Sequence, residues 1–167
     1  MERRLQESAI IKRLVEFPYL PSPLSVIEAA LSMVEVKPYE VFADLGCGDG
    51  SVLIEAAKKF GVYCVGFEVN PTLVTLAHKK AEIAGVKHLI DIVCSDLFTI
   101  DFSRFNVIYV YPFPPIIPRL SEKIVCECRK GTRVLVHDYS LSGLKPTKSA
   151  QTFERGIHVH LIYLYTM

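Results

Sequence analysis

Hydrophobic positions follow two alternating periods along the chain. Helical spacing of apolar residues occupies residues 2–16 and 24–35, and the proline-rich segment FPYLPSP separates these stretches. From residue 41 onward, short β-rich runs alternate with helix-like stretches. The runs predict strands over 41–44, 62–67, 89–93, 106–111 and 132–137, and the stretches predict helices over 51–59, 71–84 and 116–129. This alternation predicts a parallel sheet with helices on both faces.

The C-terminal end has a different pattern. The segments QTF and IHVHLIYLY, joined by ERG, predict two strands with a tight turn, so the last strand is expected to run antiparallel. Neither an internal repeat nor a linker interrupts the chain. We therefore expect a single α/β domain, in which residues 1–37 form an N-terminal helical addition and residues 38–167 form the core.

Composition narrows the class of protein. The 167 residues are 50% hydrophobic and 22% charged, with a net charge of +1, which is typical of a globular domain that buries its own core. The sequence has no excess of positive charge that would indicate a nucleic-acid partner. Lys12 and Arg13 interrupt the apolar residues near the N-terminus, so we expect a cytoplasmic protein without a membrane partner. The oligomeric state stays open, and a monomer is compatible with the sequence.

The cysteines and histidines indicate no metal site. The five cysteines are an odd number, which suits reduced thiols, and no second cysteine pair or neighbouring histidine pair completes a zinc ligand set. His158 and His160 alternate along the last expected strand, which favours one polar face of that strand. We therefore expect no metal ligand among these residues.

Acidic residues follow three successive strands of the expected sheet. Asp44 lies at the end of the first strand, Glu68 follows the second, and Asp96 comes shortly after the third. In an open parallel sheet, ligands bind at the carboxyl ends of the strands, near the point where the strand order reverses. Each residue alone is also compatible with a turn or a solvated strand end. Three in succession indicate a binding site.

The glycine-rich turn after the first strand, DLGCGDG, indicates a cationic ligand. A dinucleotide pyrophosphate at this turn would be repelled by Asp44, and the third glycine of the dinucleotide fingerprint is not at the required spacing. S-adenosylmethionine instead carries an ammonium and a sulfonium group. In this interpretation Asp44 faces the positive charge, while Gly46 and Gly48 permit close backbone approach. Asp49 adds a polar or water-bridged contact.

The other two strand ends complete the predicted cofactor site. Glu68 lies 22 residues after Gly46 and is expected to accept hydrogen bonds from both ribose hydroxyls, with Val69 beside it. Asp96 is expected to accept a hydrogen bond from the adenine amine. Leu97 and Phe98 offer an apolar wall to the ring.

The motifs resemble those of a known enzyme class. DLGCGDG, GFEVNP and CSDLF resemble the nucleoside-binding motifs of class I, seven-stranded methyltransferases. Over residues 38–167 the resemblance implies a Rossmann-like sheet in the order 3-2-1-4-5-7-6. More narrowly, PYLPSP, DLGCGDGSV and KGTRVLVHDYSLSGLKP followed by YLY look like the small archaeal protein-lysine methyltransferases and their eukaryotic mitochondrial relatives. This narrower resemblance implies proteins that present lysine as substrates.

The proline-rich segment YVYPFPPIIP is expected to form the acceptor side of the site. Methyltransferases that act on bases or glutamine place Asn or Asp before Pro-Pro, whereas Phe113 precedes Pro114 here. The missing polar residue argues against a planar amine as the acceptor. Tyr19, Tyr111 and Phe113 are instead candidates for an apolar channel that admits a lysine amine, with core packing as the equal alternative.

Several assignments stay open at this point. Tyr19 is also expected beside the cofactor. Ser22 is expected either to touch the cofactor carboxylate or to cap a helix that begins at Pro23. His137 and Asp138 end the fifth strand and are secondary candidates for substrate binding, with a local turn as the alternative. Methylation of RNA or a small metabolite, or binding of S-adenosylmethionine without turnover, are the other functions compatible with the sequence.

Overall fold

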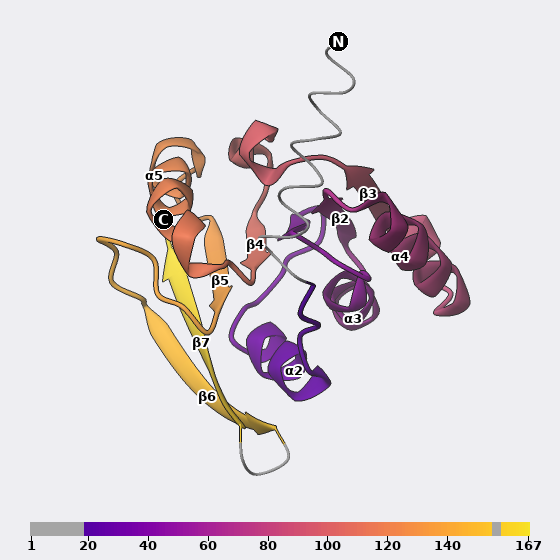
Figure 1. The fold of residues 1–167 in the computed structure, drawn as a ribbon, viewed down its shortest axis with the longest axis horizontal. Coiled ribbons are helices and arrows are strands. Elements are labelled where there is room, and N and C mark those ends of the chain that lie inside the picture. The colour runs from indigo at the N-terminus through magenta and orange to yellow at the C-terminus, as the bar shows by residue number, and fades with distance from the viewer. Residues whose placement is uncertain (1–18, 155–157) are drawn as a thin grey trace.

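A seven-stranded sheet forms the centre of the computed structural model, which describes residues 19–154 and 158–167 (Figure 1). Its strands are β1 (Val41–Leu45), β2 (Tyr63–Glu68), β3 (Ile90–Cys94), β4 (Val107–Val110), β5 (Arg133–His137), β6 (Lys148–Glu154) and β7 (His158–Thr166). The strand order is β3-β2-β1-β4-β5-β7-β6, and β7 runs antiparallel to both of its neighbours. The order implied by the resemblance and the antiparallel last strand are thus confirmed.

Helices cover both faces of the sheet, as Figure 1 shows. They are α2 (Leu24–Ser32), α3 (Ser51–Phe60), α4 (Pro71–Ile83) and α5 (Ile117–Glu127). The expected helix over 2–16 lies outside the described residues. The helix expected over 24–35 ends at Ser32, although Val34 beyond it is still buried, so the apolar period extends past the helix end. None of the described helices is both long and apolar enough to cross a membrane.

The core divides into two layers because side chains of a strand alternate between its faces. Val107 and Tyr109 of β4 pack with α2, α3 and α4 on one face. Ile108 and Val110 of the same strand pack with α5 and with Phe102 on the other face. Burial on both faces explains why the central strands are continuously apolar instead of alternating apolar and polar residues.

Local signals place the loops at the carboxyl edge of the sheet. Asn70 caps α4, since its side chain accepts a hydrogen bond from the amide of Thr72 at 3.0 Å, and Pro71 is compatible with the first helical position. The antiparallel pairing of β5 with β7 sets His137 opposite Ile162, so the end of β5 lies beside the first half of β7. Strands β1, β2 and β4 run parallel to one another, so the loops that follow them meet at one edge of the sheet.

Candidate active site

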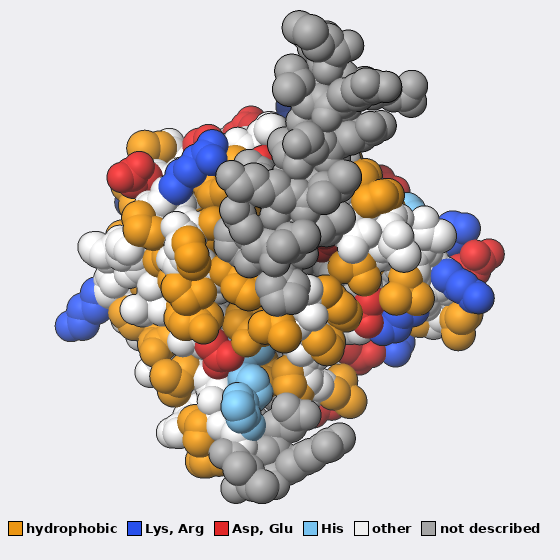
Figure 2. All heavy atoms as spheres, viewed as in Figure 1, with side chains coloured by type: hydrophobic (Ala, Val, Ile, Leu, Met, Phe, Trp, Pro, Cys, Tyr) orange, Lys and Arg blue, Asp and Glu red, His pale blue; other side chains and the backbone are white. Residues whose placement is uncertain are grey.

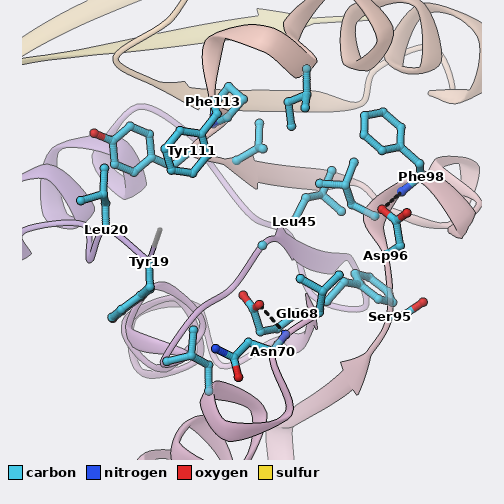
Figure 3. Close-up of a pocket in the computed structure, with 18 of the residues that line it drawn as sticks. Tyr19, Leu20, Leu45, Glu68, Asn70, Ser95, Asp96, Phe98, Tyr111 and Phe113 are labelled. Carbon is cyan, nitrogen blue, oxygen red and sulfur yellow. Dashed lines mark hydrogen bonds between the residues drawn. The ribbon is translucent and has the colours of Figure 1, made fainter. Parts of the chain in front are cut away.

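A cavity of about 540 Å³ lies at the carboxyl ends of β1, β2 and β4. In Figure 3, Glu68 and Asn70 lie on one side of it, and Asp96 and Phe98 lie on a second side. Tyr111 and Phe113, with Tyr19 and Leu20 nearby, lie across from these polar groups. The cavity thus has a polar part with two carboxylates and an aromatic part, and its size is typical of a site for a nucleoside-sized ligand.

The glycine turn forms part of the floor of this cavity. Gly46 has a φ of 85°, and a methyl group at its Cα would meet no heavy atom within 4 Å because the residue faces the cavity. The amides of Gly46 and Cys47 both donate to the carbonyl of Phe67, at 2.8 and 3.0 Å, which fixes the turn against β2. The backbone therefore offers an open cradle of the kind that a closely approaching ligand needs.

Glu68 connects the end of β2 to the glycine turn. Its Oε2 accepts a hydrogen bond from the amide of Gly48 at 3.0 Å, and its Oε1 accepts one from the amide of Asn70 at 2.8 Å. The side chain is largely buried but lines the cavity. Because each carboxylate oxygen has a second lone pair, both remain able to accept a hydroxyl of a ribose, and this predicted role stays a prediction.

Asp44 is not among the described residues that line the cavity; it is 2% exposed. Burial raises the pKa of its carboxyl well above the usual range, and the nearby Glu68 and Asp49 raise it further. A cation bound close to these carboxylates would lower that pKa and relieve their mutual repulsion. Asp44 can therefore interact electrostatically with a cationic ligand, as expected, although its side chain does not line the cavity.

Asp49 is held by protein groups at the start of α3. Its carboxylate accepts hydrogen bonds from the amide and hydroxyl of Ser51, at 3.1 and 2.8 Å, and pairs with the Lys80 ammonium at 2.5 Å. Burial raises the pKa of Asp49, but these hydrogen bonds outweigh it and hold the pKa below its ordinary value. The residue therefore ties the glycine turn to α4, and its expected contact with the cofactor stays untested.

The adenine side of the predicted site contains the expected residues. Asp96 accepts a hydrogen bond from the amide of Phe98 at 3.1 Å, and Asp96, Leu97, Phe98 and Val69 all line the cavity. Arg119 of α5, which the sequence did not single out, lies with its guanidinium 4.0 Å above the Phe98 ring and also lines the cavity. The only signal for Arg119 in the sequence is its position as the first charged residue after the apolar PFPPIIP.

The two candidates from PYLPSP have different surroundings. Tyr19 lines the cavity, and burial together with the Asp49 carboxylate raises the pKa of its hydroxyl, which is therefore neutral. Ser22 is not among the described cavity residues. Its hydroxyl lies 2.9 Å from the Tyr109 hydroxyl and 3.3 Å from Nδ1 of His137. The alternative of a Ser22 helix cap is wrong, because α2 has no side-chain cap and its N-cap residue is Pro23.

Tyr111 and Phe113 form the expected aromatic wall. Strand β4 ends at Val110, just before the proline-rich loop, as prolines require. The Tyr111 ring packs on the His137 ring with centroids 3.8 Å apart, and its hydroxyl donates to Oδ2 of Asp138 at 2.9 Å. His137 and Asp138 are not among the described residues that line the cavity. They support its wall from behind.

His160 departs from the sequence expectation. The residue is 6% exposed and faces His137 and Asp138, whereas His158 is exposed. A solvated polar face therefore describes His158 only. Burial lowers the pKa of His137, so its imidazole is neutral at neutral pH. The sequence period placed both histidines on one side of the strand, but it did not reveal that the end of β5 covers one of them.

The comparison with known families decides the identity. The sequence model of one family, described as the ANTKMT methyltransferase domain, matches residues 44–148, which include the glycine turn, Glu68, Asp96 and the proline-rich loop. The chain belongs to this methyltransferase family.

Relatives extend the match beyond that domain. The methyltransferase is 34% identical over 151 residues to a protein-lysine N-methyltransferase of Saccharolobus islandicus, which covers 90% of this chain and 93% of that relative. It is also 29% identical over 133 residues to the adenine nucleotide translocase lysine N-methyltransferase of Mus musculus. That second match covers 79% of this chain but only 57% of the longer relative.

A solved structure supports the fold and the cofactor. An RNA methyltransferase from Salinibacter ruber, in complex with S-adenosyl-L-homocysteine, superposes with a TM-score of 0.79 at 32% identity, covering 88% of this chain and 93% of that one. The methyltransferase uses S-adenosylmethionine, so the cofactor predicted from the strand-end carboxylates is confirmed. The open Gly46 cradle, the two cavity carboxylates and the apolar wall at Phe98 fit this cofactor. The assignment of single residues to its groups remains a prediction.

Proposed function

We propose that this methyltransferase transfers methyl groups to the ε-amines of lysines in proteins. One observation carries the proposal: the match to the archaeal protein-lysine N-methyltransferase spans nine-tenths of both chains, so it includes the acceptor side as well as the cofactor motifs. A match over 90% of the 167 residues has to include the PYLPSP segment, which precedes the family domain.

The aromatic side of the cavity suits a lysine amine. When bound, S-adenosylmethionine supplies an electrophilic methyl group; the protein has to present a neutral amine in line with it. Contact with Tyr111 and Phe113 favours the neutral amine over the ammonium, because an apolar environment disfavours charge. The same rings exclude water from the amine and accommodate a methylated product.

The opposite side of the cavity orients the cofactor. Glu68 is the last residue of β2 and Asp96 follows β3, and both face the cavity with carboxylate groups that accept hydrogen bonds. These groups are separated from the aromatic wall by the width of the cavity in Figure 3. Methyl transfer to an alkyl amine depends mainly on how the protein aligns the two reactants. Polar groups that orient the cofactor on one side and an apolar wall for the amine on the other provide this alignment.

RNA is the second candidate acceptor. The solved RNA methyltransferase is 32% identical to this chain over most of its length, which makes the nucleic-acid acceptor a specific alternative. The net charge of +1 gives little general attraction to a phosphate backbone. Phe113, which stands before Pro114 and Pro115 on the acceptor side, also offers no polar group to a base amine. Both observations favour the lysine acceptor.

A parallel comparison of three acceptor fractions tests the proposal. S-adenosylmethionine with a labelled methyl group is supplied with protein depleted of nucleic acid, with RNA depleted of protein, and with small metabolites from the same cells. We expect label in the protein arm, which mass spectrometry assigns to methylated lysine. Label confined to RNA or to a metabolite overturns the lysine acceptor. Cofactor binding without transfer in every arm identifies a binding module instead of an enzyme.

A further inference from the structure

Three side chains behind the aromatic wall converge on one point. Nε2 of His137 lies 3.0 Å from Nδ1 of His160, and that Nδ1 lies 3.1 Å from Oδ2 of Asp138. The third side of the triangle, from Nε2 of His137 to Oδ2 of Asp138, is 3.4 Å. The residues come from the end of β5 and from β7, which pair antiparallel. These atoms belong to a cluster that the cofactor cavity does not use.

The triangle has the dimensions of a metal-binding face. In a tetrahedral zinc site with ligand distances of about 2.0–2.1 Å, neighbouring ligand atoms are roughly 3.3 Å apart. The three distances in the cluster, 3.0, 3.1 and 3.4 Å, are close to this value. Two imidazole nitrogens and one carboxylate oxygen are a donor set that first-row divalent ions bind. We propose that His137, Asp138 and His160 bind a divalent transition-metal ion of the zinc class.

The surrounding groups hold these atoms in place. Nδ1 of His137, the ring nitrogen that faces away from the triangle, lies 3.3 Å from the Ser22 hydroxyl and 3.2 Å from the Tyr109 hydroxyl. A proton on that nitrogen leaves a lone pair on Nε2, which faces the triangle. Metal-binding histidines commonly have such a partner on the second nitrogen, because it fixes both the tautomer and the ring orientation.

The carboxylate is oriented in the same way. Oδ1 of Asp138 accepts a hydrogen bond from the Leu161 amide at 3.1 Å, and Oδ2 accepts one from the Tyr111 hydroxyl at 2.9 Å. The backbone of Asp138 has a φ of 63°, in the left-handed region that, among residues other than glycine, Asp and Asn adopt most readily. Its amide donates to the Leu161 carbonyl at 2.7 Å. This turn directs the carboxylate back toward the two histidines.

The position of the cluster gives the ion a supporting role. Tyr111 contacts two of the three ligands, through its ring to His137 and through its hydroxyl to Asp138. A bound ion would therefore fix the wall against which the acceptor lies. His158 is exposed, and its ring centroid lies 5.2 Å from that of the buried His160. Figure 2 shows pale-blue histidine side chains beside a red acidic side chain on the surface of this face. Asp138 is only partly buried, so the cluster lies just beneath the surface.

Cobalt and zinc titrations of the full chain, purified without a histidine tag, test the site. Cobalt bound by nitrogen and oxygen has only weak visible bands, whereas binding to thiols such as the exposed Cys94 and Cys126 adds strong near-ultraviolet absorption. We expect one ion per chain without the thiol band. Zinc should also raise the melting temperature, since a ligand that binds the native state stabilises it by mass action.

Asp138→Asn is the decisive variant. Asparagine tolerates the left-handed backbone. Its single oxygen accepts from either the Leu161 amide or the Tyr111 hydroxyl, so one of these hydrogen bonds is lost together with the anionic ligand. We expect metal affinity to fall at least about tenfold, and the rise in melting temperature on adding zinc, measured from each variant's own metal-free value, to be lost. His88→Ala, at an exposed histidine far along the chain, is the matched control and should keep full affinity. If the wild type binds no metal ion, or if Asp138→Asn binds it with unchanged affinity, the proposed site is wrong. The three side chains then form only a hydrogen-bonded network.

Discussion

The ring of Tyr19 lies directly against the backbone of Gly48. A methyl group at the Gly48 Cα would overlap Cε2 of that ring and stand 3.0 Å from Cδ2. Tyr19 thereby covers the glycine turn at the point where the amide of Gly48 donates to Glu68. This contact couples the predicted acceptor channel to the cofactor turn. A methyl group added at Gly48 would therefore disturb both.

Gly48→Ala is expected to reduce the methylation rate at least about tenfold, because the new methyl group displaces Tyr19 and strains a backbone with a φ of 54°. Gly61→Ala is the matched control. It has a similar φ of 64°, so the backbone cost of about 1–2 kcal/mol is shared, but its methyl group meets no heavy atom within 4 Å. Equal rates in the two variants would show that the contact with Tyr19 is irrelevant to activity.

Glu68→Ala is expected to weaken S-adenosylmethionine binding by about two orders of magnitude, on the order of 2–3 kcal/mol. The variant loses the predicted ribose contact and releases the amides of Gly48 and Asn70. Calorimetry measures the affinity, with Glu82→Ala on the exposed side of α4 as the control. If a folded Glu68→Ala protein binds the cofactor as the wild type does, Glu68 has no part in the site.

Asp44→Asn is expected to stabilise the free protein at neutral pH and to weaken cofactor binding. The native pKa of Asp44 lies above its unfolded value, so the native state binds more protons, and stability is lost as pH rises from about 3.9 through the native pKa. The variant has no carboxyl group at this position, so it does not lose this part of its stability as the pH rises. Its advantage in melting temperature should therefore grow with rising pH. Parallel curves for variant and wild type between about pH 4 and 8 would contradict the raised pKa.

Tyr19→Phe is expected to retain much of the methylation rate, whereas Tyr19→Ala should lose at least about tenfold, roughly 1.4 kcal/mol. The ring closes the cavity and covers Gly48, while the hydroxyl lies near the Asp49 carboxylate. Initial rates on a lysine-rich protein measure this difference, and they should rise toward alkaline pH as more amine loses its proton. Cofactor affinity serves as the control and should change far less. A Tyr19→Ala enzyme with the wild-type rate would remove Tyr19 from the channel.

Local patterns along the chain were enough to predict the layers of the fold and the location of the site. Alternating periods predicted the parallel strands, and the ends of those strands placed Glu68 and Asp96 at one edge, where both line the cavity. These predictions succeed because period and strand direction are local properties of the chain. The order of the strands came from the resemblance to a family, since local periodicity does not specify which strands are neighbours.

The partners of the buried polar groups could not be predicted from these patterns and are known from the assembled fold. Ser22 meets Tyr109 and His137 across 87 and 115 residues, and Asp49 meets Lys80 across 31. His160 is buried against His137 because the antiparallel register of β5 and β7 brings their ends together. A repeating pattern tells which face a side chain occupies. Which group covers that face depends on strand pairing and register, and these are fixed only when the whole sheet assembles.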